Sequence, residues 1–145
     1  MRVKDLLNVK GKDVVSIDAG SSVEDAIRVM NSRKISALMV TDHAKSVGIF
    51  TERDVVKCYL RNAGKAFKDI SLKDTMTTDL IVARMDDNLN DLMSVLVEKN
   101  IRHLPVVEDG NVIGMLSIRD VIQTQVGTLT SEIHYLKDYI IGSSR

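Results

Sequence analysis

Several residue types are scarce in this chain, and each scarcity argues against a class of protein. The 145 residues include no Trp, two Phe and three Tyr, too few aromatic rings for a platform on which single-stranded nucleic acid stacks. The one cysteine, Cys58, cannot form an internal disulfide, which is typical of proteins from reducing compartments. Lys and Arg together number 20, as do Asp and Glu, so no basic excess indicates nucleic-acid binding.

Long hydrophobic runs are also missing. No apolar stretch approaches the roughly 20 residues that span a bilayer. The first ten residues mix charges with apolar side chains and lack the hydrophobic segment of a secretory signal. Yet 44% of the residues are hydrophobic, enough for one globular domain or two small subdomains that share a core. We therefore expect a soluble, cytoplasmic protein with neither a membrane nor a nucleic acid as partner.

What the chain does contain is an internal repeat. Residues 13–57 align with residues 79–123 without a gap, at a shift of 66 residues and with ten identical positions. The segment VKDLL at 3–7 resembles LKDTM at 72–76, which leaves three extra residues in the loop that follows the first of these segments. Chance seldom preserves pattern, turns and spacing over 45 positions, so the repeat predicts a duplicated structural unit.

Each copy has the same order of predicted elements. A short strand (14–17 and 80–83) comes before a helix that Ser22 or Asn88 caps. Two apolar runs separated by the polar turns DHAKS and EDGN then predict a hairpin, and a second helix follows. One such unit cannot cover both faces of its sheet, so we expect the two copies to pack around one core. A last amphipathic helix is predicted over 128–141.

The clearest local motif is the corner between hairpin and second helix, GIFTERD at 48–54 and GMLSIRD at 114–120. One interpretation is a capping box, in which a hydroxyl and an acid three residues later bond backbone amides of the first turn. The other is a ligand site, where the helix N-terminus and the arginine attract an anion and the carboxylate accepts hydrogen bonds from a ribose diol. Gly48 and Gly114 either relieve crowding in the strand or let a ligand approach the backbone.

The β-α-β-β-α unit, the corner G-h-h-[T/S]-x-x-D and the segment IRHLPVV at 101–107 resemble a tandem pair of CBS domains, the Bateman module. The resemblance extends from about residue 3 to residue 126. It implies an α+β fold in which two β-α-β-β-α CBS subdomains pack by pseudo-two-fold symmetry, plus a C-terminal helix. The expected boundaries are 1–68 for the first motif, 69–127 for the second and 128–145 for a helical tail.

The same resemblance implies a non-enzymatic regulatory or sensor module that binds AMP, ADP or ATP in clefts between the two motifs and requires no cofactor. S-adenosylmethionine or a dinucleotide is an alternative ligand, and a structural interaction module with empty clefts is an alternative function. A hydrolase is disfavoured because no motif places catalytic residues or a metal site. The expected partners are an adenosine-containing small molecule, a second copy in a homodimer and a regulated protein of unknown identity.

The resemblance also assigns ligand-binding residues to two clefts. The first is expected to combine its corner with the facing copy: Thr51, Arg53, Asp54, Ile81, Val82, Ile101, Arg102 and His103. The second is expected to combine Ser117, Arg119, Asp120, Val15, Ser16, Ile35, Ser36 and Ala37. Arg102 and His103 fall where related pairs often hold phosphate, whereas Ser36 and Ala37 offer no charge. We therefore expect the first cleft to prefer the more phosphorylated ligand.

Other reactive side chains have simpler interpretations. Cys58 falls on the apolar side of its helix and is expected in the core. His43 lies in a polar turn and His134 in the tail, with no neighbouring Cys or acidic residue at the spacing of a metal site. The stretch RNAGKAFKDI at 61–70 lacks the spacing of a phosphate-binding P-loop.

Overall fold

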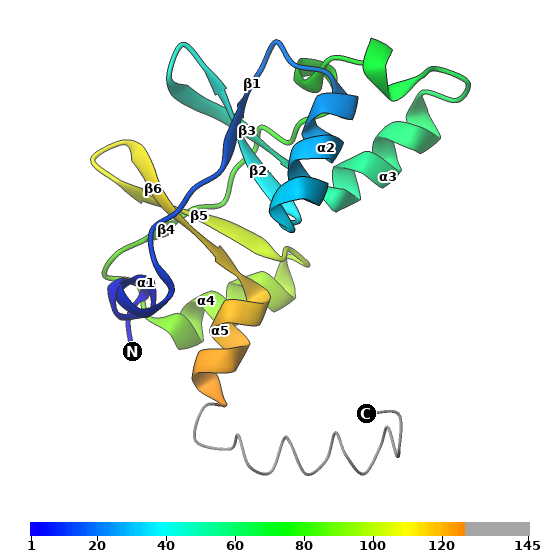
Figure 1. The fold of residues 1–145 in the computed structure, drawn as a ribbon. Coiled ribbons are helices and arrows are strands. Elements are labelled where there is room, and N and C mark those ends of the chain that lie inside the picture. Colours follow the sequence, from blue (N-terminus) through cyan, green and yellow to red (C-terminus); the bar gives the residue numbers. More distant parts are fainter. Residues whose placement is uncertain (127–145) are drawn as a thin grey trace, which may run out of the picture.

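The computed structural model describes residues 1–126, which form two units of the same build (Figure 1). The first unit contains β1 (Ser16–Asp18), α2 (Val23–Arg33), β2 (Ala37–Asp42), β3 (Lys45–Thr51) and α3 (Glu52–Arg61). The second unit repeats this order with β4 (Ala83–Arg84), α4 (Leu89–Glu98), β5 (His103–Glu108), β6 (Asn111–Ser117) and α5 (Ile118–Gln125). The helix α1 (Val3–Lys10) precedes the first unit, and the short 3-10 helices η1 (Phe67–Asp69) and η2 (Leu72–Asp74) follow it.

Each unit has a three-stranded sheet, and the two sheets repeat one another in register. The first strand is parallel to the second, and the second is antiparallel to the third. Ala37 pairs with Thr51 as His103 pairs with Ser117, and each hairpin has an irregularity after a valine, Val40 or Val106. The predicted fold class, two β-α-β-β-α subdomains, is confirmed. The predicted helix at 128–141, the tail at 128–145 and His134 lie outside the described residues.

The hairpin turns form where the sequence predicts them. Each has two central residues, His43–Ala44 and Asp109–Gly110, and all four have positive φ angles between 50° and 79°. Turns of this kind match the right-handed twist of the flanking strands. His43, as expected, is exposed, and its ring lies 3.6 Å from the Asp42 carboxylate.

The first strand of each unit begins later than the pattern predicts. Strand β1 starts at Ser16 rather than at residue 14, and β4 starts at Ala83 rather than at residue 80. Val14 and Leu80 pack instead against a small apolar cluster between the two sheets. Their apolar character therefore reflects this interface and not strand pairing.

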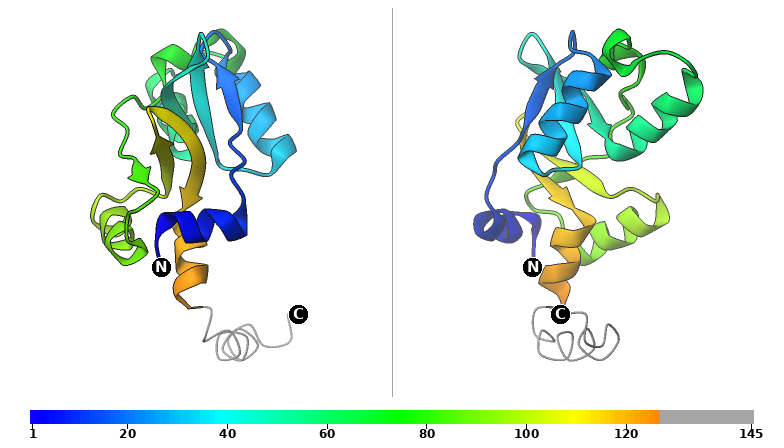
Figure 2. Two further views of the ribbon diagram at one scale, coloured as in Figure 1. Left: turned by 90° about the vertical axis from the view of Figure 1, so that its left-hand side faces the viewer. Right: turned by 45° about the vertical axis from the view of Figure 1, so that its right-hand side comes forward.

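The prediction of one shared core is wrong, because each unit has its own. Helices α2 and α3 cover one face of the first sheet, and α4 and α5 cover one face of the second (Figures 1 and 2). Where the uncovered faces meet, a smaller cluster joins Ala37, Met39 and Ile49 to Val112 and Met115. Cys58 is buried in the first core, as expected, and burial raises the pKa of its thiol.

The two units exchange the segments that precede them. Helix α1, ahead of the first unit, packs Val3, Leu6 and Leu7 into the second core, where the Val3 amide donates to the Asp87 carbonyl at 3.0 Å. The segment ahead of the second unit packs Ile70 and Leu72 into the first core. The similarity of VKDLL to LKDTM is thus explained by a shared task, which is to complete the core of the other copy.

The corner glycines make room for these exchanged segments. A Cβ atom at Gly48 would lie 2.9 Å from the Thr77 carbonyl oxygen, and one at Gly114 would lie 3.0 Å from the Leu7 side chain. Of the two interpretations for these glycines, the structure supports relief of crowding. Within residues 1–126 no helix is both long and apolar enough to cross a bilayer.

Candidate ligand-binding clefts

Both corners form the capping box that their sequence allows. The Thr51 hydroxyl accepts a hydrogen bond from the Asp54 amide at 3.4 Å, and the Asp54 carboxylate accepts one from the Thr51 amide at 2.9 Å. Ser117 and Asp120 make the same exchange at 3.1 and 2.9 Å. In both cases Oδ2 of the carboxylate serves the cap, so any ligand binding depends on what the rest of the carboxylate contacts.

The Asp54 carboxylate is fully engaged inside the protein. Its Oδ2 also accepts the Thr51 hydroxyl at 3.2 Å, and its Oδ1 accepts the Thr77 hydroxyl at 3.0 Å. The residue is only 5% exposed. Both of its oxygens are thus bonded within the protein, one of them to Thr77 of the segment between the two units.

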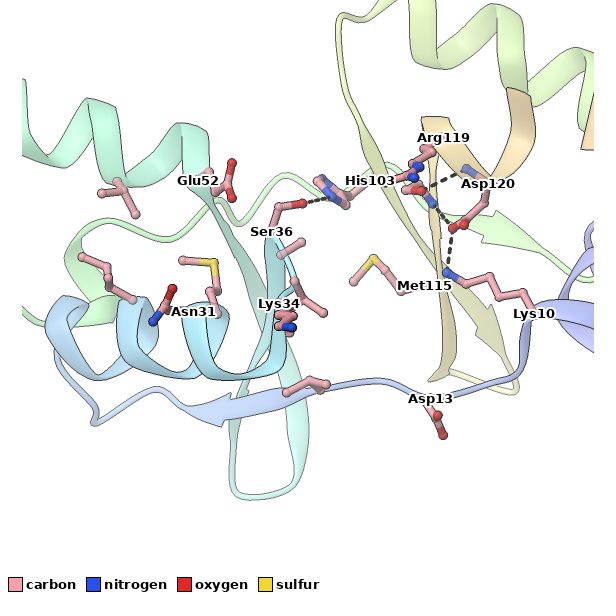
Figure 3. Close-up of a pocket in the computed structure, with 17 residues that line it drawn as sticks. Lys10, Asp13, Asn31, Lys34, Ser36, Glu52, His103, Met115, Arg119 and Asp120 are labelled. Atoms are coloured by element: carbon pink, nitrogen blue, oxygen red, sulfur yellow. Dashed lines mark hydrogen bonds and ion pairs between the residues drawn. The ribbon is translucent and has the colours of Figure 1, made fainter. Parts of the chain in front are cut away.

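The Asp120 carboxylate is more open and is paired with a cation. Lys10, the last residue of α1, donates to Oδ2 at 2.6 Å (Figure 3). No residue within 1–126 donates a hydrogen bond to Oδ1. Partial burial would raise the pKa of this carboxyl, but the hydrogen bonds from Lys10 and Ser117 outweigh it and lower the pKa. Asp120 is therefore an ionised acceptor with one oxygen available to a ligand.

Each corner faces a cavity, and the two cavities differ in size. The Asp120 cavity has a volume of about 740 Å³, within the roughly 300–1,000 Å³ of small-molecule sites. The Asp54 cavity has about 220 Å³, below that range. The larger cavity lies between the two units, and both contribute to its wall: Val15, Ile27, Met30, Asn31, Lys34, Ile35, Ser36, Ala37, Glu52 and Val55 from the first, and His103, Met115, Ser117, Arg119 and Asp120 from the second, with Lys10 and Asp13.

Most of the predicted site residues line the cavity to which the sequence assigns them. Of those predicted for the second cleft, Val15, Ile35, Ser36, Ala37, Ser117, Arg119 and Asp120 line the larger cavity. Of those predicted for the first, Thr51, Arg53, Asp54, Ile101, Arg102 and His103 line the smaller one. Ser16, Ile81 and Val82 line neither. Ser16 is an exposed strand residue, and Ile81 and Val82 precede β4.

The structure adds charged residues that the sequence did not single out. Lys10 and Lys34 line the Asp120 cavity, as do Glu52 and Asp13. The premise that the second corner meets only the uncharged Ser36 and Ala37 is therefore wrong. Lys10 ends α1 in the segment where the first copy has three extra residues, and that departure from the repeat was the available signal.

His103 belongs to both cavities rather than to the first alone. Its Nε2 lies 2.9 Å from the Ser36 hydroxyl, and both residues line both cavities. Burial lowers the pKa of His103, with the Arg102 and Lys10 charges acting the same way and Glu52 and Asp120 opposing them. Arg53, at the first corner, donates to the Asn100 carbonyl at 2.7 Å, so its guanidinium is tied to the backbone of the other unit.

Comparison with known families decides what this duplicated fold is. The family model for the CBS domain matches the chain twice, at residues 3–61 and 68–127. The chain belongs to the CBS-domain family. The predicted resemblance to a tandem CBS pair is thereby confirmed.

Two solved CBS structures share the fold over nearly their whole length. The CBS-domain protein ATU1752 from Agrobacterium tumefaciens is 36% identical with a TM-score of 0.82, covering 86% of this chain and 99% of that one. The CBS pair of protein MJ0100, solved with 5′-methylthioadenosine and S-adenosylmethionine, is 26% identical with a TM-score of 0.76. That match covers 88% of this chain and 98% of the other.

Curated relatives include both small CBS proteins and larger enzymes. The mitochondrial CBS domain-containing protein CBSX3 of Arabidopsis thaliana is 31% identical, over 97% of this chain and 72% of the relative. Inosine-5′-monophosphate dehydrogenase of Methanocaldococcus jannaschii is 34% identical over 77% of this chain. The match spans only 22% of that enzyme.

Proposed function

We propose that this CBS pair is a non-enzymatic regulatory module that binds an adenine nucleotide (AMP, ADP or ATP) in the Asp120 cleft. The observation that carries the proposal is the ionised carboxylate of Asp120, which has an available oxygen at the wall of an approximately 740 Å³ cavity between the two motifs. The complex of MJ0100 with two adenosine compounds supports it. So does the match to ATU1752, a CBS-domain protein whose solved chain is covered over 99% of its length.

The lining of the cavity suits each part of such a ligand. The Asp120 carboxylate accepts hydrogen bonds from the 2′- and 3′-hydroxyls of ribose, and the Ser117 hydroxyl lies beside it. Met30 and Met115 offer polarisable thioethers against the faces of adenine. No step of this binding requires a resident cofactor.

Regulation follows from the position of the cleft between the two motifs. A ligand that contacts both motifs favours the relative orientation in which all of these contacts are made. A regulated protein then recognises that orientation. The homodimer and the cytoplasmic location expected from the sequence are part of the same proposal.

Calorimetric titration of the full chain with adenosine, AMP, ADP, ATP and S-adenosylmethionine tests the proposal, with thermal unfolding as a second readout. We expect at least one adenine nucleotide to bind and Asp120→Asn to weaken it about tenfold, because a charged acceptor is lost. Asp54→Asn is the matched control at the equivalent position, and it should leave the affinity unchanged. Chromatography should return the nucleotide intact.

Three results would overturn the proposal. If no adenosine compound binds or raises the unfolding temperature, an interaction module with empty clefts replaces the sensor. If S-adenosylmethionine binds and no nucleotide does, the ligand class is wrong. If the nucleotide is hydrolysed by the wild-type protein but not by Asp120→Asn, the protein is an enzyme.

A further inference from the structure

Three cationic side chains line the Asp120 cavity, and they come from three different elements. Lys10 ends α1, Lys34 follows the last residue of α2, and Arg119 lies in the first turn of α5. Figure 3 shows Lys10 reaching Asp120 from one side and Lys34 lying on the opposite side of the cleft. Within residues 1–126, the side chains of Lys34 and Arg119 have no ion-pair or hydrogen-bond partner.

Lys34 occupies a backbone position that does not suit lysine. It is the C-cap of α2, with φ 56° and ψ 46° in the left-handed region. The equivalent residue of the second copy is Asn100, with φ 54°, and Asn is one of the few non-glycine residues that adopt this conformation readily. The Lys34 side chain is exposed and contributes nothing to either core. Residues kept in unfavourable conformations cluster at functional sites.

Within residues 1–126, no cation bonds the Asp54 carboxylate as Lys10 bonds that of Asp120. Outside its cap, the Asp54 carboxylate accepts the neutral hydroxyl of Thr77 at Oδ1, whereas the Asp120 carboxylate accepts the Lys10 ammonium at Oδ2. When a ribose diol bonds the carboxylate of Asp120, the Lys10 ammonium stays at the cavity wall and is available to a second group of the ligand. Both cations that distinguish the larger cleft thus lie where the two copies differ.

The acidic residues of the cavity do not neutralise the charge of Lys10, Lys34 and Arg119. The carboxylate of Asp13 points away from Lys10 and Asp120 (Figure 3). Glu52 lies on the side of the cleft far from Lys10, at the start of α3 (Figure 3). Asp120 itself is the acceptor for the ribose, so the cations remain for the group attached to C5′.

We propose that Lys10, Lys34 and Arg119 form an anion subsite that makes the Asp120 cleft select nucleoside phosphates over adenosine compounds with a cationic sulfonium at C5′. This rests on the proposed function and names the ligand class of the same cleft. It also reverses the sequence-based expectation that the Asp54 cleft takes the more phosphorylated ligand. Arg102 and Lys57 also line that cleft, but it is smaller, and its Arg53 guanidinium is held by the Asn100 carbonyl.

The test compares ATP with adenosine in calorimetric titrations of the full chain, because their affinity ratio isolates the phosphate contribution. Lys34→Asn copies the residue of the second motif and relieves the backbone, so the variant should unfold at the same temperature or higher. We expect it to lower the ATP-to-adenosine affinity ratio about tenfold, the effect of losing one charge-assisted contact. Lys10→Gln should lower the ratio similarly and raise adenosine affinity, since it frees Asp120.

Lys12→Gln is the control variant, because Lys12 is exposed and lines neither cavity. It should change the ratio less than twofold. If adenosine and ATP both bind but Lys34→Asn and Lys10→Gln behave like Lys12→Gln, the anion subsite is wrong and the proposed function stands. If no adenosine compound binds, the proposed function itself fails. Tighter binding of S-adenosylmethionine than of ATP also overturns the subsite.

Discussion

Asp54 and Asp120 hold equivalent positions in the two copies and cap equivalent helices, yet their surroundings differ. Asp54 is buried, with both carboxylate oxygens bonded to Thr51 and Thr77. Asp120 is partly exposed, paired with Lys10, and opens on a cavity more than three times larger. The same residue therefore serves mainly as a structural cap in one copy and has capacity for a ligand in the other.

The difference teaches where a duplicated fold diverges. The register of both sheets, both hairpin turns and both capping boxes are the same in the two copies. The clefts differ through Lys10 at the end of α1 and through Lys34, the C-cap of α2, which stands where the second copy has Asn100. Both are positions at which a change leaves the strands and helices intact, so electrostatics changed while architecture did not.

The largest expected effect tests whether the two copies are as alike in stability as in topology. Leu7 precedes the first unit and is fully buried in the core of the second, whereas Leu72 precedes the second unit and is fully buried in the core of the first. Leu7→Ala and Leu72→Ala should each lower the free energy of unfolding by about 3 kcal/mol, measured by urea denaturation. One transition should remain in both variants. A loss confined to one variant would show that only one copy depends on its exchanged segment.

The next largest effect is an unequal loss of stability when the glycine of each corner is replaced by alanine. A methyl group at Gly48 would meet a backbone oxygen of Thr77 at 2.9 Å, whereas one at Gly114 would meet the Leu7 side chain at 3.0 Å. A side-chain end moves more easily than backbone, so Gly48→Ala should destabilise the protein by about 2 kcal/mol and Gly114→Ala by about 1 kcal/mol or less. Thermal unfolding of the two variants measures the difference. Equal losses would contradict the crowding that the structure indicates at Gly48.

Features set by neighbouring residues can be predicted from the sequence, and features set by distant contacts cannot. The caps at Ser22 and Thr51 and the hairpin turns depend on neighbours a few residues away, so their sequence pattern suffices. The late start of β1 and β4 was missed because Val14 and Leu80 owe their apolar character to a contact between sheets. That contact is set by the packing of distant segments, which a pattern of apolar residues does not encode.

Some residues of the candidate site can likewise be predicted from the local sequence, and others cannot. The corner residues Ser117 and Asp120 lie within a repeated motif, and the motif identifies them. Lys10 and Lys34 reach the cavity only because α1 packs on the second core and α2 ends in a left-handed residue. Neither fact follows from the local sequence, although the extra loop residues and the change from Asn to Lys marked both places.

The ion pair between Lys10 and Asp120 predicts a pH dependence of the free energy of unfolding. The pKa of Asp120 is lowered in the folded protein, so the stabilisation is present above the ordinary Asp value and lost as pH falls through the lowered pKa. Lys10→Gln should reduce the free energy of unfolding by about 0.5–1 kcal/mol at pH 7, a small value because both side chains are partly exposed.

Urea denaturation at pH 7 and near pH 2 measures this effect. The difference between wild type and Lys10→Gln should shrink at the lower pH, where Asp120 becomes protonated. Lys57→Gln is the matched control, since Lys57 lines the Asp54 cavity and forms no ion pair within residues 1–126. A difference that stays constant with pH would mean that Lys10 stabilises α1 through packing and not through Asp120.

The smallest effect concerns His103, the side chain that the two clefts share. Burial lowers its pKa, so the folded protein disfavours the charged ring. Its contribution to stability is complete above the unfolded value of about 6.5 and is lost as pH falls through that value toward the lowered one. His103→Gln should therefore flatten the fall in stability as the pH drops below about 6.5. Nuclear magnetic resonance of the imidazole should give a pKa below the ordinary one. An unshifted pKa would mean that water reaches this ring and that the wall between the clefts is open.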